Sequence, residues 1–398
     1  MNISDRAKNL GESATLKMAR LANELKENGK DVISLSLGEP DFFTPDYIKE
    51  ALKKAIDENH SFYTPVPGSK KLREAIANKF KRDNQIHYSP EQIVVSTGAK
   101  QSLMNVILAT INPGDEVILP APYWVSYFDM IEFAGGVPVE LKTSIDDDYK
   151  VTKSQVQDAI TDKTRMFLFS NPCNPSGSSY SDDELRSISE ALKGKENILI
   201  VSDEIYEYIN FEGQNTSMAK FESIKSRVVT VNGLSKGYAM TGYRLGFMGA
   251  PLEVAKACSK IQGQFTSGAN AVTQEAAVTA LNDGPQKIEY MKKTFELRRD
   301  LFVEELSKVE GFKVNKPSGA FYVLPDISYY FGKKYKDRLI ESSEDFSEIL
   351  LEYALVATTP GGAFGTPQTI RLSYATSDDM LIEAAKRIKE LCAQITDA

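Results

Sequence analysis

Residues 233–246 of this chain read Gly-Leu-Ser-Lys-Gly-Tyr-Ala-Met-Thr-Gly-Tyr-Arg-Leu-Gly. The run before them, residues 228–231, is short and β-branched, which predicts a buried strand. Small residues surround Lys236 just beyond this strand, so a flat ligand could approach its amine without obstruction. Eight positions later, the planar guanidinium of Arg244 offers paired donors that suit a phosphate. Taken alone, either cation would be an ordinary surface side chain, so the rest of the chain decides.

The composition limits the possible classes of protein. The length of 398 residues predicts about two to three domains, and 42% hydrophobic with 26% charged residues is typical of globular proteins. A net charge of −8 argues against nucleic acid as the main partner, and no apolar run is long enough to span a membrane. The 3 cysteines and 2 histidines predict neither a disulfide framework nor a metal site. The N-terminus lacks the apolar core of a signal peptide, so a cytoplasmic location is expected.

The order of apolar runs predicts the fold class. Between residues 46 and 289, strand-like runs alternate with amphipathic segments, which predicts an α/β domain with a mostly parallel sheet. Residues 1–45 and 290–398 are predicted to form a smaller α+β domain with an N-terminal arm. Ligands of such sheets bind at the carboxyl ends of the strands. The side chains predicted at strand ends are Gly98, Trp124, Asn174, Asp203 and Lys236.

Three short strings follow predicted strands and consist of small residues or turn formers. Residues 38–42, GEPDF, come after a predicted strand at 32–37, and alone they would indicate a turn. Residues 97–102, TGAKQS, open a helix whose free N–H groups could seat an anion. Residues 171–177, NPCNPSG, could equally be a loop of turn formers. Ser181 and Glu184 then form a capping box for the next helix.

Charged and aromatic side chains also occur at or within apolar strands. Asp203 ends an apolar run, where its carboxylate needs a cationic partner unless it lies at the surface. Arg371 lies inside the apolar strand 369–373, where an arginine either reaches solvent or pairs. Trp124, the only tryptophan, could pack in the core or stack on a flat ring.

Together these strings resemble the class I and II aminotransferases, which bind pyridoxal phosphate (PLP) on the fold-type I scaffold. The resemblance spans about residues 13 to 395 and rests most strongly on 233–246 and 171–177. It implies a large domain with a mostly parallel seven-stranded sheet flanked by helices, plus a smaller α+β domain. It also implies a homodimer with shared active sites that moves an amino group between amino acids and 2-oxo acids in a ping-pong cycle.

The resemblance assigns the catalytic roles. Lys236 would hold PLP covalently and then act as general base and acid. Asp203 would keep the ring nitrogen protonated, so that the ring can accept electrons. Tyr206 and Asn174 would bind the phenolic oxygen of the cofactor. The bond between Asn174 and Pro175 is expected to be cis.

The resemblance also assigns the remaining contacts. The cofactor phosphate would be held by the turn at Gly98, Ala99 and Lys100 together with Ser235 and Arg244. Tyr63 would reach the phosphate of the neighbouring subunit's cofactor, although alone it would be a half-buried aromatic residue on a proline-rich loop. Trp124 would stack on the pyridine ring. The substrate α-carboxylate would be bound by Arg371, beside Gly38, Trp124 and Asn174.

Two features favour aspartate as the amino donor and 2-oxoglutarate as the acceptor. One subgroup of aspartate aminotransferases binds the distal carboxylate with an arginine from the other subunit, and none occurs here between Arg244 and Arg298. A second subgroup uses a lysine after the phosphate-loop glycine with a Ser and a Thr near the N-terminus. Lys100, Ser13 and Thr15 match that pattern, although Lys100 could be solvated and the other two could cap a helix.

Several alternatives remain open from the sequence. Bacterial relatives that accept prephenate often carry a basic residue two positions before that Ser, where this chain has Gly11. Prephenate, aromatic or other amino acids therefore remain alternative substrates. A PLP-dependent β-lyase or decarboxylase could use the same residues, and a PLP-binding regulator is a non-enzymatic alternative. A NAD-dependent dehydrogenase is disfavoured because GxGxxG is missing.

Overall fold

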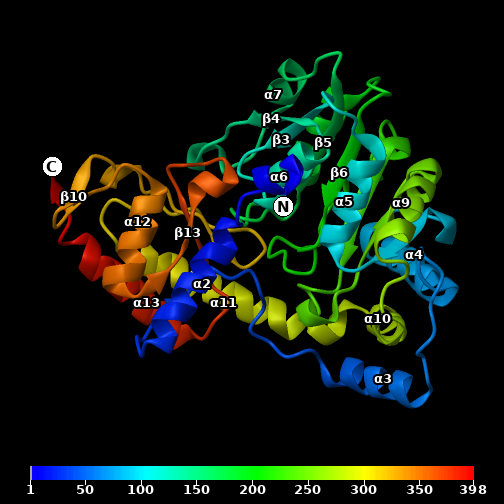
Figure 1. Ribbon diagram of the computed structural model, residues 1–398, viewed down its shortest axis with the longest axis horizontal. Coiled ribbons are helices and arrows are strands. Elements are labelled where there is room, and N and C mark those ends of the chain that lie inside the picture. Colours follow the sequence, from blue (N-terminus) through cyan, green and yellow to red (C-terminus); the bar gives the residue numbers. More distant parts are fainter. Residues whose placement is uncertain (1) are drawn as a thin grey trace.

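The computed structural model describes residues 2–398, which form two bodies connected by the long helix α11 (Glu289–Leu306) (Figure 1). The larger body is built on a seven-stranded sheet in the order β2-β8-β7-β6-β5-β3-β4. Only β8 runs antiparallel to its neighbours. The sheet strands are β2 (Ile93–Ser96), β3 (Glu116–Pro120), β4 (Val137–Leu141), β5 (Thr164–Ser170), β6 (Leu199–Asp203), β7 (Val228–Gly233) and β8 (Gly246–Gly249). The predicted mostly parallel seven-stranded sheet is confirmed.

Helices cover both faces of this sheet, which explains why its central strands are apolar throughout rather than alternating. Strand β7 is buried along its whole length, as its β-branched sequence predicted. The first face is covered by α3 (Asp46–Asp57), α4 (Lys70–Asn84), α7 (Lys153–Asp158), α8 (Asp182–Leu192) and α10 (Ala271–Asp283). The other face is covered by α5 (Ala99–Thr110), α6 (Ser126–Phe133) and α9 (Leu252–Phe265).

The smaller body has its own apolar core, in which Phe295, Phe302, Phe321 and Leu372 are fully buried. Its helices are α2 (Ala14–Glu27), α12 (Ser343–Ile349) and α13 (Asp378–Cys392), and the short helix α1 (Asp5–Asn9) precedes α2 in the chain. Its strands are β1 (Ile33–Ser34), β9 (Tyr322–Val323), β10 (Lys333–Tyr335), β11 (Arg338–Leu339), β12 (Val356–Ala357), β13 (Thr359–Pro360), β14 (Ile370–Ser373) and β15 (Thr396–Asp397). The division of the chain at residues 46 and 289 stays a prediction. No helix in residues 2–398 is long and apolar enough to cross a membrane.

The strand predicted at residues 32–37 is much shorter in the structure, where β1 pairs only with β12. The pairing ends there because the carbonyl of Ser36 accepts hydrogen bonds from the side chains of Arg371 (2.6 Å) and Thr359 (3.3 Å). Because side chains occupy this carbonyl, it does not bond to the backbone of a neighbouring strand. Ser36 instead helps to hold the guanidinium of Arg371 in place.

Two local predictions are confirmed. The Asn174–Pro175 peptide bond is cis, as are Asn171–Pro172 and Ala121–Pro122. Ser181 caps α8 with Glu184 in a reciprocal capping box.

Candidate active site

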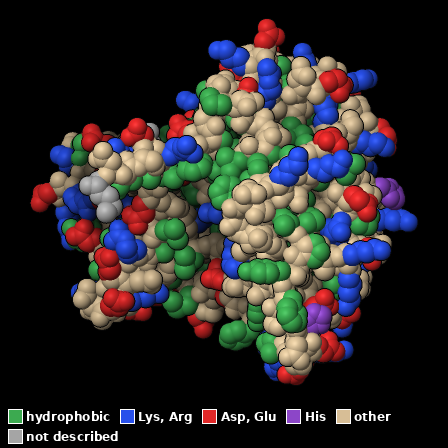
Figure 2. All heavy atoms as spheres, turned by 45° about the vertical axis from the view of Figure 1, so that its right-hand side comes forward, with side chains coloured by type: hydrophobic (Ala, Val, Ile, Leu, Met, Phe, Trp, Pro, Cys, Tyr) green, Lys and Arg blue, Asp and Glu red, His purple; other side chains and the backbone are tan. Residues whose placement is uncertain are grey.

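A cavity of about 390 Å³ lies between the two bodies, beyond the carboxyl ends of the central strands. Figure 2 shows the molecular surface hollowed between these bodies. The structure brings nearly all of the sequence-predicted site residues together around this cavity. They are Ser13, Thr15, Gly38, Ala99, Lys100, Trp124, Asn174, Asp203, Tyr206, Ser235, Lys236, Arg244 and Arg371.

Lys236 reaches into the cavity from the turn after β7, and its Nζ donates to the carbonyl oxygen of Gly38 at 2.5 Å. Burial lowers the pKa of this amine to about 8. Glu39 opposes the shift, and the charges of Arg371 and Arg244 add to it. The lowered pKa increases the fraction of the amine that is neutral at a given pH, and only a neutral amine has the lone pair needed to attack a carbonyl carbon.

Asp203 ends β6 and is almost completely buried. The hydroxyl of Tyr127 donates to its Oδ2 at 2.6 Å, and the backbone N–H of Ile205 donates to its Oδ1 at 3.2 Å. Burial raises the pKa of Asp203 to about 6, although the Tyr127 hydrogen bond opposes this shift. No cation in residues 2–398 forms an ion pair with this carboxylate. It is therefore suited to bind a protonated ligand nitrogen.

Arg371 lies in β14 and is fully buried, yet its partners are all neutral. Its guanidinium donates to Asn174 Oδ1 at 2.9 Å and to the Ser36 carbonyl at 2.6 Å. Its Nε has no hydrogen-bond partner among the described residues. A buried guanidinium without an anion is costly, so this side chain is suited to receive a carboxylate.

A second cation, Arg244, lies against the N-terminus of α5. Gly98 is the N-cap of α5 with a φ of 85°, and a Cβ there would lie 2.4 Å from Arg244 Nη2. A Cβ on Gly246 would lie 2.1 Å from the backbone nitrogen of Ala99. Both positions therefore need glycine. The free N–H groups of α5 and the guanidinium together form an anion site that suits a phosphate.

The mouth of the cavity carries Lys100, whose Nζ lies 4.8 Å from the centroid of the Trp124 ring. Burial lowers the pKa of Lys100, and the nearby charge of Arg244 adds to this shift. Ser13 and Thr15 reach the same cavity from the start of α2. Ser13 occupies the N-cap position of α2, but its side chain makes no capping hydrogen bond. Ser13 thus takes the cap position that the alternative predicted, without the side-chain hydrogen bond of a cap.

The structure does not bring Tyr63 to this cavity. Its side chain is 97% exposed and lines a different hollow, which also contains Phe62 and Gly268. Among the predicted site residues it is the one that lies apart from the others in the single chain.

The comparison with known proteins agrees with this geometry. The sequence profile described as "Aminotransferase class I and II" matches residues 30–388. The chain belongs to this family. Its relatives include the aspartate/prephenate aminotransferase of Cereibacter sphaeroides, 43% identical over 398 residues and 99% of both chains. The aspartate aminotransferase of Bacillus sp. is 42% identical over 388 residues, which covers 97% of this chain and 98% of the relative.

Solved structures agree with the family. The aspartate aminotransferase from Rhizobium meliloti superposes with a TM-score of 0.96 at 38% identity and full coverage of both chains. The Thermus thermophilus aspartate aminotransferase with maleate gives a TM-score of 0.92 at 37% identity, with 98% of this chain and 100% of that chain covered. The expected fold-type I architecture is therefore confirmed for this aminotransferase.

Tyr127 and Tyr322 are among the cavity residues of this aminotransferase that were not predicted from the sequence. Tyr127 contacts Asp203, and it follows Trp124 by three positions at the same strand exit. Tyr322 lies in β9, and its hydroxyl is 2.8 Å from that of Tyr206. A Cβ on Gly38 would lie 2.4 Å from the Tyr322 hydroxyl. The only signal for Tyr322 was a tyrosine inside an otherwise apolar strand.

Proposed function

We propose that this aminotransferase transfers the amino group of aspartate to 2-oxoglutarate in a ping-pong cycle with PLP as its cofactor. The single observation that carries the proposal is the pattern of unpaired charge in the cavity. Within residues 2–398, Arg371 and Arg244 are cations without an anion and Asp203 is a carboxylate without a cation, and Lys236 is an amine of lowered pKa beside them. A cofactor phosphate, a ring nitrogen and a substrate carboxylate would complete that pattern.

The residues present fit PLP. Arg244, Ser235 and the Gly98 turn would hold its phosphate, Asp203 would bind its ring N–H, and Trp124 would cover the ring. Tyr206 and Asn174 would bind its phenolic oxygen, and Lys236 would hold its aldehyde carbon. When bound, PLP supplies an aromatic system that accepts electrons from the substrate Cα. The amine of Lys236 would then remove the Cα proton as a general base and return it as an acid.

The substrate assignment uses both ends of the cavity. Arg371 would bind the α-carboxylate, while Lys100, Ser13 and Thr15 would bind the distal carboxylate of aspartate or 2-oxoglutarate. The relatives at about 43% identity are named for aspartate, and some also for prephenate, so prephenate is a second candidate acceptor. Gly11 carries no side chain and is not among the residues that line the cavity.

We further propose that the active form is a homodimer. Phe43, Phe62 and Phe265 expose 89%, 84% and 70% of their surface, as an uncovered interface would. Tyr63 is also exposed, and a second copy covering this face would allow it to reach the phosphate in its neighbour's cavity. Dimerisation would then complete the phosphate site.

Two measurements test the proposed function. Borohydride reduction of the PLP-loaded enzyme is expected to fix the cofactor mass on the peptide that contains Lys236. A panel of amino acids is then scored for bleaching of the cofactor absorbance, and aspartate and glutamate are expected to bleach it and leave pyridoxamine phosphate. A label on another lysine would overturn the active-site assignment. Release of ammonia with the cofactor left as PLP would instead identify a β-lyase.

A further inference from the structure

The turn after β6, residues 204–207, has two sides, and only one of them faces the cavity. Asp203 and Tyr206 line it, whereas Glu204 and Glu207 are buried on the opposite side. The N–H of Glu207 donates to the carbonyl of Glu204 at 3.0 Å, so the turn encloses Tyr206. Whatever fixes the two glutamates from behind therefore fixes the part of the chain that carries Tyr206.

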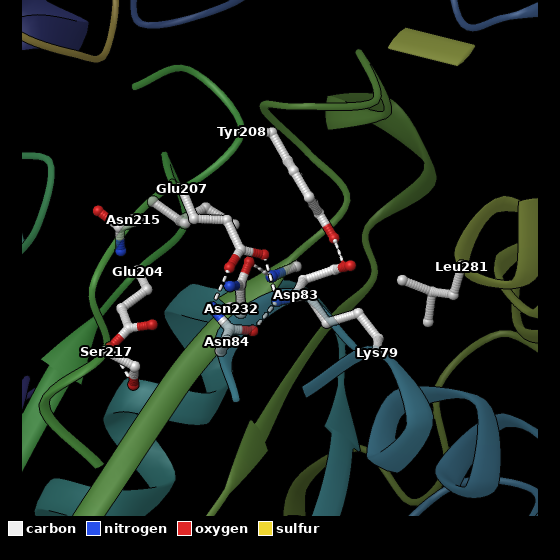
Figure 3. A network of polar contacts seen from close by, with 12 residues as sticks. Lys79, Asp83, Asn84, Glu204, Glu207, Tyr208, Asn215, Ser217, Asn232 and Leu281 are labelled. Carbon is white, nitrogen blue, oxygen red and sulfur yellow. Dashed lines mark hydrogen bonds and ion pairs between the residues drawn. The ribbon is translucent and has the colours of Figure 1, made fainter. Parts of the chain in front are cut away.

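Glu207 is held by two residues of α4 in a closed network (Figure 3). Its Oε1 forms an ion pair with Lys79, whose side chain is 0% exposed. Its Oε2 accepts a hydrogen bond from Asn84 Nδ2 at 2.6 Å, and Lys79 Nζ donates to Asn84 Oδ1 at 2.6 Å. One carboxylate oxygen thus faces the ammonium of Lys79 and the other accepts a hydrogen bond from Asn84, which together fix the direction of the carboxylate as well as its position.

Glu204 is anchored separately at the other end of the turn. Its Oε1 accepts hydrogen bonds from Ser202 at 3.0 Å and from Ser217 at 2.8 Å. Burial raises the pKa of Glu204 to about 8, and the charge of Glu207 adds to this shift. Among the described residues, the pair of opposite charges that holds the turn from behind is the one between Lys79 and Glu207.

A buried ion pair of this kind contributes little to stability, because an apolar pair of similar volume is often equally or more stable. Lys79 also occupies a core position of α4, seven residues after Leu72 and next to Phe80 on the buried side of the helix. What the ion pair provides, and an apolar contact would not, is a fixed direction for the Glu207 side chain. We propose that Lys79 and Glu207 are positioning residues that hold the turn from behind and thereby fix the Tyr206 hydroxyl in the cavity.

Tyr206 is placed so that small displacements matter. Its hydroxyl lies 2.8 Å from that of Tyr322, and its ring centroid lies 6.0 Å from Lys236 Nζ. This inference rests on the proposed function, in which the hydroxyl donates to the phenolic oxygen of PLP. A shift of the turn would lengthen that hydrogen bond, and a misplacement of about 1 Å can cost up to about 100-fold in rate.

The experiment is a double-mutant cycle between Glu207→Gln and Tyr206→Phe in the PLP-loaded enzyme. Its main readout is the pH titration of the cofactor absorbance without substrate, because a hydroxyl that donates to the phenolic oxygen stabilises the deprotonated chromophore. Both variants are expected to raise the pKa at which the absorbance of enzyme-bound PLP changes, called the chromophore pKa below. Glu207→Gln is also expected to lower kcat about tenfold. In the Tyr206→Phe background, Glu207→Gln is expected to add little to either quantity.

Arg227→Met is the matched control for a general loss of stability in the larger body. Arg227 is also buried and donates to the carbonyls of Leu192, Lys195 and Ile198, but it does not contact the turn. It is expected to lower the melting temperature while leaving the chromophore pKa and kcat unchanged. If Glu207→Gln behaves like this control, or if its effects add fully to those of Tyr206→Phe, the proposal is overturned.

A second variant covers the case in which Glu207→Gln does not fold because it leaves Lys79 charged and unpaired. Lys79→Met combined with Glu207→Leu removes both charges and is expected to melt close to the wild-type temperature. It is still expected to raise the chromophore pKa and lower kcat. A wild-type spectrum and rate in this variant would overturn the positioning role. Failure of the wild-type chain to bind PLP or transaminate would instead refute the proposed function.

Discussion

Two groups of buried charges flank the turn after β6, and they differ in whether the protein itself neutralises them. In the cavity, Arg371 and Asp203 have only neutral hydrogen-bond partners among residues 2–398. Behind the turn, Lys79 and Glu207 pair directly, and Asn84 bonds to both. The difference teaches that burial alone does not mark a functional site. The mark is buried charge that lacks a counter-charge, because such charge becomes favourable only when a ligand supplies one.

Removing the cavity amine should have the largest effect on activity. Lys236→Ala is expected to lower kcat about 10⁴-fold, because proton transfer by a positioned group contributes up to about that factor. Lys236→Arg should be equally inactive, since a guanidinium stays protonated and cannot act as the neutral amine. Single-turnover bleaching by aspartate and circular dichroism of both variants provide the measurements. Residual activity above 1% of wild type in either variant, with the fold intact, would show that another residue moves the proton.

Asp203→Asn sharpens the comparison because it should change activity and stability in opposite directions. If Asp203 holds the ring nitrogen of PLP protonated, its loss in the PLP-loaded enzyme is expected to lower kcat about 10²–10³-fold. Near-normal turnover would mean that Asp203 does not face the cofactor ring.

In the cofactor-free protein the same substitution is expected to stabilise the fold at neutral pH. Burial raises the pKa of Asp203 from 3.8 to about 6, so ionisation opposes folding above pH 6 by about 3 kcal/mol. Since the folded state binds the proton more tightly, this cost is absent below pH 3.8 and develops as the pH rises to 6. Urea unfolding of wild type and Asp203→Asn at pH 4 and pH 7.5 measures the effect. An equal difference at both pH values would contradict it.

Lys100→Ala tests the mouth of the cavity. If Lys100 pairs with the distal carboxylate, kcat/KM for aspartate should fall about 10–150-fold, the value of one charge-assisted hydrogen bond. Activity toward alanine and the affinity for PLP should stay unchanged. Lys17→Ala is the matched control, since Lys17 lies exposed on α2 and does not line the cavity. An equal loss for every substrate, together with weaker PLP binding, would show that Lys100 binds the cofactor phosphate and not the distal carboxylate.

The sequence predicted the sheet and most of the cavity because both depend on local signals. Apolar runs marked the strands, and glycine-rich or asparagine-proline strings marked the ends where ligands bind. Asp203 and Lys236 each follow a predicted strand, but their roles came from the family resemblance of the strings around them. The meeting of Arg371 with Asn174, 197 positions apart in the chain, came only from the family resemblance.

The network behind the turn was not predicted, for a physical reason. Lys79 lies on the buried stripe of α4, but a helical pattern tolerates one lysine there because the side chain can usually reach solvent. Its charge is paired with Glu207, which comes 128 positions later and follows a different element, β6. The available signal was a lysine at a position where the helical pattern of α4 calls for an apolar residue. Such a lysine predicts a buried partner of opposite charge but does not say which residue it is.

The smallest expected effect comes from Tyr127→Phe, which removes one hydrogen bond and keeps the ring. The Tyr127 hydroxyl lies 2.6 Å from Asp203 Oδ2 and stabilises the carboxylate over the carboxylic acid. Its loss should therefore raise the pKa of Asp203. If Asp203 binds the ring nitrogen of PLP as proposed, the proton between them should then move toward the carboxylate. The ¹⁵N shift of ring-labelled PLP should move toward that of the unprotonated nitrogen, and kcat should fall about tenfold. Tyr88→Phe removes a buried hydroxyl bonded to Thr230, away from the cavity, and should change neither quantity. An unchanged ¹⁵N shift in Tyr127→Phe would show that Asp203 sets the protonation of the ring without help from Tyr127.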